Sequence, residues 1–97
     1  MWQVIASQIS EATGSDFHIL DKKPLSGGDI NQAFRISDGH DSYFVKLNDR
    51  ARVDMFRCEW NSLEHLLRTQ TLLVPRPICC GTTVSSSFLV LEYLSLS

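Results

Sequence analysis

The stretch Tyr43-Phe44-Val45-Lys46-Leu47 guides the interpretation of the whole sequence, because it places one charged residue inside an apolar run. Side chains alternate between the two faces of a strand, so Lys46 shares a face with Phe44 and points away from the face of Val45. A lone ammonium group near an apolar face is costly unless it is paired. Lys46 is therefore either a solvated residue at the edge of the strand or one member of a pair with an acidic residue elsewhere in the chain.

Glu59 is the candidate partner. Residues from about 52 to 69 have the three- and four-residue spacing of apolar side chains that indicates an amphipathic helix. The apolar stripe of this helix contains Phe56, Trp60, Leu63, Leu66 and Leu67. Glu59 lies beside it, three residues after Phe56. For Lys46 or Glu59 alone, a solvated surface position is the simpler interpretation, but together they favour a functional pair.

A glycine pair, Gly27-Gly28, precedes both residues. Missing side chains let backbone N–H groups approach a phosphate closely. Gly-Gly alone is more often an ordinary turn, and no Gly-Lys-Ser/Thr string follows that would make it a Walker loop. The order of glycine turn, strand lysine and helix glutamate is nevertheless typical of the phosphate-binding half of a protein-kinase-like fold, in which the lysine points at phosphate oxygens.

The remaining elements predict a single α+β domain over residues 1–97 with a five-stranded antiparallel sheet and a short N-terminal helix. The helix spans Trp2–Thr13 and ends near Gly14. Strands are expected at 17–25, 32–37, 42–48, 78–82 and 88–93, with a hairpin turn at 38–41 and a polar turn at 83–87. Pro75 and Pro77 exclude helix before the fourth strand.

Composition excludes several classes of protein. The net charge of -2 provides no basic stripe for nucleic acid, and no apolar run approaches the roughly 20 residues of a membrane span. The start of the chain does not resemble a signal peptide. Three cysteines, Cys58, Cys79 and Cys80, are a poor disulfide framework and favour reduced thiols in a cytoplasmic protein. No metal site is expected from the histidines and cysteines.

Other polar residues are expected to have no catalytic role. His40 and His65 are interpreted as solvated residues, in a turn and on a helix surface. Cys79 and Cys80 are more simply packing residues of a strand than nucleophiles. Arg50 and Arg52 are interpreted as solvated residues, with a functional role at the nearby predicted cleft as the lesser alternative.

Taken together, these strings resemble the fructosamine kinase (ketosamine kinase) family, within the superfamily of aminoglycoside phosphotransferases and choline kinases. The carriers of the resemblance are Leu25-Ser26-Gly27-Gly28-Asp29-Ile30-Asn31, Tyr43-Phe44-Val45-Lys46, Phe56-Arg57-Cys58-Glu59 with Leu63, Val74-Pro75-Arg76-Pro77 and residues 88–94. Each motif alone is degenerate, whereas five in this order are fairly specific. They cover essentially all of the chain.

The resemblance implies ATP-dependent phosphorylation of the sugar 3-hydroxyl of ketosamines, such as glycated lysines. It places the phosphates of ATP under a loop that includes Gly27, Gly28, Asp29 and Asn31. Lys46 would hold the α/β-phosphates and Glu59 would orient Lys46. Leu91 would line the pocket, while the backbone of Glu92, Tyr93 and Leu94 would meet the adenine edge.

The resemblance also implies a second lobe with the catalytic aspartate, the Mg²⁺ ligands and the sugar pocket, and the sequence contains no His-Gly-Asp or Asp-Phe-Gly string. The chain is therefore expected to be an isolated N-terminal lobe that is inactive alone. In an open cleft, the Lys46–Glu59 pair would contribute roughly 0–1 kcal/mol. Phe44, Leu91 and Leu94 would face solvent and support weak self-association. Two alternatives remain: another phosphotransferase of the superfamily, or a non-enzymatic α+β interaction module.

Overall fold

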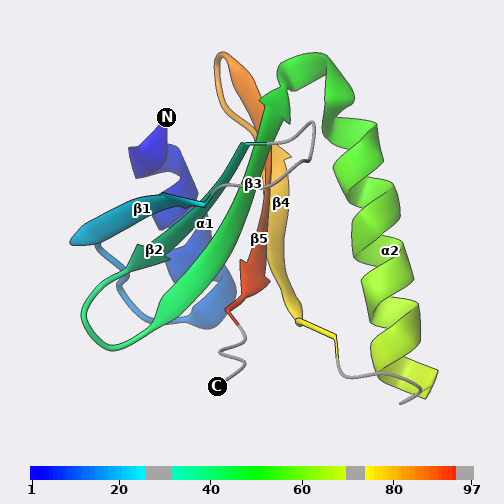
Figure 1. The fold of residues 1–97 in the computed structure, drawn as a ribbon, viewed down its shortest axis with the longest axis horizontal. Helices are drawn as coiled ribbons and strands as arrows, with labels where there is room; N and C mark the ends of the chain where they lie inside the picture. Colours follow the sequence, from blue (N-terminus) through cyan, green and yellow to red (C-terminus); the bar gives the residue numbers. More distant parts are fainter. Residues whose placement is uncertain (26–31, 70–73, 94–97) are drawn as a thin grey trace.

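The computed structural model describes residues 1–25, 32–69 and 74–93, and these residues form one antiparallel sheet with a helix on each face (Figure 1). The elements in chain order are α1 (Trp2–Thr13), β1 (Asp21–Leu25), β2 (Gln32–Ser37), β3 (Ser42–Asp49), the 3-10 turn η1 (Arg50–Arg52), α2 (Val53–Thr69), β4 (Pro77–Thr82) and β5 (Ser86–Glu92). The five strands found in these ranges have the order β1-β2-β3-β5-β4. The predicted α+β class and antiparallel sheet are confirmed.

Strand β5 lies between β3 and β4 and is buried on both faces. Phe88 and Val90 pack into the core on the side of α1, whereas Leu89 and Leu91 pack on the side of α2. A strand covered on both faces has no need for alternating polar residues. This position explains the uninterrupted apolar run of residues 88–91.

Helix α1 covers one face through Ile5 and Ile9, which are spaced by four residues and fully buried. They pack in a cluster that also contains Val45 of β3. The helix ends at Gly14, whose φ of 75° is left-handed and whose N–H donates to the carbonyl of Ser10. The predicted helix and its end are confirmed.

Helix α2 covers the other face less completely. Phe56 is its one fully buried residue, while Trp60 and Leu63 of the predicted stripe are half-buried. Figure 1 shows α2 standing beside β4 and β5, at the end of the sheet opposite β1. Part of its apolar side therefore faces space that the described residues do not fill.

The hairpin between β2 and β3 forms as the sequence predicts. Asp38 Oδ1 accepts hydrogen bonds from the backbone N–H groups of His40 at 2.9 Å and Asp41 at 2.7 Å. Gly39 has a φ of 95°, which a residue without a side chain adopts at little cost. These hydrogen bonds lower the pKa of the Asp38 carboxyl, because they stabilise its charged form.

Three expectations are wrong in detail. The first strand begins at Asp21 rather than at residue 17, because Phe17 is buried against α1 and its N–H donates to Ser10 Oγ at 2.9 Å. The turn predicted at 83–87 is shorter, since Ser86 and Ser87 already pair with β3. Leu91 does not face solvent, because it is only 4% exposed beneath α2.

Candidate functional site

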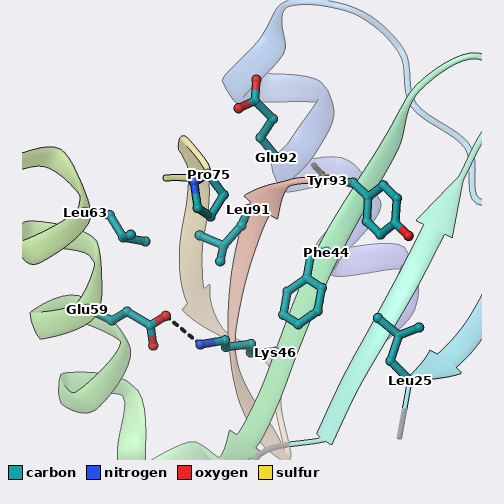
Figure 2. Close-up of a pocket in the computed structure, with 9 residues that line it drawn as sticks. All are labelled: Leu25, Phe44, Lys46, Glu59, Leu63, Pro75, Leu91, Glu92 and Tyr93. Carbon is teal, nitrogen blue, oxygen red and sulfur yellow. Dashed lines mark hydrogen bonds and ion pairs between the residues drawn. The ribbon is translucent and has the colours of Figure 1, made fainter. Parts of the chain in front are cut away.

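Lys46 and Glu59 meet across the space between β3 and α2. Lys46 Nζ lies 2.6 Å from Glu59 Oε2, and the two side chains are 19% and 31% exposed. Figure 2 shows the two side chains pointing at each other, one from the strand and one from the helix. The charge pair that the sequence predicts therefore forms, and it is partly shielded from water.

The strand register explains why Glu59 is the counterion. Lys46 lies opposite Ala33 of β2 and Leu89 of β5, and neither neighbour carries a charge. The Lys46 side chain extends from β3 toward α2, where its Nζ meets Glu59 (Figure 2). Glu59 is in the second turn of α2, on the side that faces the sheet.

The ion pair closes one end of a cavity of about 510 Å³. The cavity is lined by Leu25, Phe44, Lys46, Glu59, Leu63, Pro75, Leu91, Glu92 and Tyr93. In Figure 2, Leu91 lies between the ion pair and the end of β5, with Leu63 on the α2 side and Phe44 on the β3 side. Glu92 and Tyr93 follow beyond Leu91. An apolar slot with an ammonium group at one end suits a ligand that has a flat apolar part and an anionic part.

Glu92 is held by the segment before β4. Its N–H donates to the carbonyl of Arg76 at 2.9 Å, and its Oε1 accepts a longer hydrogen bond of 3.4 Å from the N–H of Arg76. The Glu92 side chain is exposed and points away from the middle of the cavity (Figure 2). Both the N–H and the carboxylate of Glu92 are therefore engaged with Arg76 rather than with the cavity.

Five of the predicted site residues are brought together around this cavity: Lys46, Glu59, Leu91, Glu92 and Tyr93. The predicted loop residues Gly27, Gly28, Asp29 and Asn31, together with Leu94, lie outside the described residues. The sequence analysis did not assign Leu25, Leu63 or Pro75 to the site. The alternation that puts Phe44 beside Lys46 was a signal for the apolar lining.

The histidines and Cys79 have the non-catalytic roles that the sequence predicts, whereas Arg50 differs from its prediction. His40 and His65 are exposed. Cys79 is buried, and burial, with a smaller contribution from Cys80, raises its thiol pKa to about 12, so it is not a nucleophile near neutral pH. Arg50 is exposed but not simply solvated, since its Nε donates to the carbonyl of Thr83 at 3.0 Å.

Two further kinds of site were sought in the described ranges. No cluster of three or more histidine, cysteine or acidic side chains there could hold a metal ion. Neither described helix has the length and apolar character needed to cross a bilayer.

Comparison with known proteins identifies the family. The model of the family described as fructosamine kinase matches residues 1–97. The chain belongs to the fructosamine kinase family. A relative from Synechocystis, provisionally named a ketoamine kinase, is 50% identical over 93 residues, which are 96% of this chain and 32% of that protein. A second from Vibrio cholerae, also named provisionally, is 43% identical over 95 residues, or 98% of this chain and 33% of that protein.

A crystal structure from Haemophilus somnus, provisionally named a fructosamine-3-kinase, has the same fold. It matches with a TM-score of 0.96 and 35% identity over all of this chain and 33% of that one. The chain thus spans about a third of the length of the relatives it matches. The match includes the whole sheet and both helices, which confirms the kinase-like α+β architecture.

Proposed function

We propose that this chain forms the ATP-binding lobe of a kinase that phosphorylates the sugar 3-hydroxyl of ketosamines. The observation that carries the proposal is the Lys46–Glu59 ion pair, which lies at one end of a cavity lined mainly by apolar side chains. An ammonium group fixed by a carboxylate is suited to hold phosphate oxygens, as the strand lysine does in protein kinases. Family membership and the names of the relatives support the substrate class.

The cavity has room for both parts of a nucleotide. In this proposal the adenine ring lies over Phe44 and Leu91, with its edge toward the carbonyl of Glu92, and the phosphates extend to Lys46. The apolar lining supplies burial for the ring, while Lys46 supplies the positive charge. The loop that includes Gly27 and Gly28, outside the described residues, would cover the phosphates.

In this proposal a Mg²⁺ ion that accompanies ATP takes its protein ligands from outside the described residues, among which no cluster of three or more metal-binding side chains occurs. Nor do the described residues offer a general base, because Glu59 is committed to Lys46 and the Glu92 side chain points away from the cavity. We therefore propose that these residues bind and orient the nucleotide and that the chain alone does not transfer phosphate. The ketosamine would bind to residues outside this chain.

A cytoplasmic location fits this role and is proposed with it. All three cysteines are free thiols. Free thiols persist in the reducing environment of the cytoplasm, where the enzyme would also meet ATP.

An amide NMR titration of the chain with Mg-ATP tests nucleotide binding. We expect shifts at Leu25, Lys46 and Tyr93, and an apparent Kd that rises about tenfold in Lys46→Ala, which corresponds to about 1.4 kcal/mol. Lys22→Ala is the matched control, because Lys22 lies over the ring of Trp2 on α1, away from the cavity. It should leave the Kd unchanged.

Absence of shifts at millimolar ATP, or equal Kd values for the wild type and Lys46→Ala, would contradict an ATP-binding role for this chain. Such a result would favour the non-enzymatic interaction module. A parallel incubation with ATP and a fructosyl-lysine peptide should give no phosphorylated product by mass spectrometry. Product formation would contradict the proposed inactivity of the chain alone.

A further inference from the structure

The side chain of Arg35 contacts Tyr93, which lines the cavity just beyond the end of β5. Arg35 Cζ lies 5.0 Å from the centroid of the Tyr93 ring, within the distance at which a cation is attracted to an aromatic face. We propose that Arg35 is a positioning residue, which holds the Tyr93 ring as a wall of the nucleotide cavity. This inference rests on the proposed function, since it concerns the same cavity.

The register of the sheet places Arg35 on the cavity face. Arg35 of β2 is opposite Phe44 of β3, and Phe44 is opposite Leu91 of β5. Both of these neighbours line the cavity. Tyr93 comes two residues after Leu91, so a side chain that extends from Arg35 toward the end of β5 meets its ring.

The guanidinium group of Arg35 has few polar partners among the described residues, so the Tyr93 ring is one of its principal contacts. One of its terminal nitrogens, Nη2, donates to Ser42 Oγ at 3.2 Å. Its Nε is buried and has no hydrogen-bond partner among the described residues. Lys23 lies opposite Arg35 on β1 and carries the same charge, so it cannot serve as a counterion. Within the described ranges, no carboxylate forms an ion pair with Arg35.

Tyr93 needs such a contact because it lies beyond the last residue of β5, Glu92. The ladder of hydrogen bonds that orders β5 therefore does not extend to it. Figure 2 shows the Tyr93 ring turned toward β3 and β2, above Phe44, whereas Glu92 points the other way. A ring that is already fixed costs a ligand less ordering on binding than a ring that must be immobilised.

The first test is the ring of Tyr93 in the ligand-free chain. In Arg35→Met we expect the aromatic ¹H–¹³C signals of Tyr93, assigned with Tyr93→Phe, to shift toward those of a free tyrosine. Arg35→Lys should restore part of the difference, because it retains a cation. Arg57→Met is the matched control, since Arg57 is exposed on α2 and pairs with Asp54. Unchanged Tyr93 signals in Arg35→Met would overturn the proposal.

The second test measures the Kd for Mg-ATP in a double-mutant cycle. Arg35→Met and Tyr93→Leu should each raise it about fivefold, which corresponds to about 1 kcal/mol, and the double variant should be no worse than either. Additive effects would overturn the proposal.

If Arg35→Met does not fold, Tyr93→Leu still tests the proposal, because an unchanged Kd in Tyr93→Leu would exclude a role for the Tyr93 ring in binding. If the wild type does not bind ATP, the proposed function fails, while the ring signals still test the positioning by Arg35.

Discussion

The ion pair between Lys46 and Glu59 joins the middle of the sheet to helix α2, with 2.6 Å between Nζ and Oε2. Near this pair, α2 packs on the sheet through an apolar cluster that includes Phe56 of α2 and Leu89 of β5. The pair therefore adds a polar contact between β3 and α2 to this apolar packing. Since the cavity lies between them, the same contact contributes to the shape of the candidate site.

Replacing Glu59 with glutamine should lower stability measurably. The side chains are neither fully exposed nor fully buried, so the cost should lie near the upper limit for surface pairs, about 1 kcal/mol. For a domain of this size, that corresponds to a fall in Tm of roughly 4–8 °C in thermal unfolding followed by circular dichroism.

The matched control is Asp54→Asn, which removes the ion pair between Asp54 and Arg57 on α2. Asp54 and Arg57 are 88% and 64% exposed, so this change should leave the Tm almost unaffected. Equal decreases in the two variants would mean that Glu59 acts only through helix propensity and general charge, and not through Lys46.

The three thiols should differ strongly in reactivity. Burial raises the pKa of Cys79 to about 12 and also raises the pKa of Cys80, so both remain protonated at pH 8. Cys58 is exposed on α2. Because the thiolate is the reactive form, iodoacetamide at pH 8 should modify the folded chain at Cys58 first.

Mass spectrometry of the alkylated protein checks this order. We expect one adduct in buffer and three in concentrated urea, where burial no longer protects the other two thiols. Cys58→Ser should remove the early adduct. Early modification of Cys79 would show that β4 separates from α1 much more readily than its packing indicates.

Weak self-association through the cavity face stays a prediction. Burial of Leu91 reduces the apolar surface that was expected to be exposed, but Phe44 remains half-buried. Sedimentation velocity should show a modest rise in average mass with concentration, which Phe44→Ser reduces. A constant monomer mass up to millimolar concentration would exclude this contact.

Local patterns in the sequence predicted much of this structure. The alternation around Lys46 and the helical spacing around Glu59 each depend on neighbours in the chain, and together they predicted an ion pair between residues 13 positions apart. The contact between Arg35 and Tyr93 had no such signal, because the direction of a ring beyond a strand end depends on the folded sheet. The start of β1 at Asp21 was also missed because it depends on a contact made only in the folded chain. The N–H of Phe17 donates to Ser10 Oγ instead of pairing with a strand.

Ser87 provides a last test of how the site is supported. Its side chain is fully buried in β5, and its Oγ donates to the carbonyl of Asp49 at 2.7 Å, where β3 ends and η1 begins. Ser87→Ala leaves that carbonyl without its donor, and such a loss typically costs about 1–3 kcal/mol. We expect a Tm at least roughly 4 °C lower in thermal unfolding, since each kcal/mol corresponds to about 4–8 °C in a domain of this size. Ser85→Ala, at an exposed position in the adjacent turn, is the control and should change the Tm little. If both serine variants unfold at the wild-type temperature, the hydrogen bond to Asp49 does not hold the end of β3 in place.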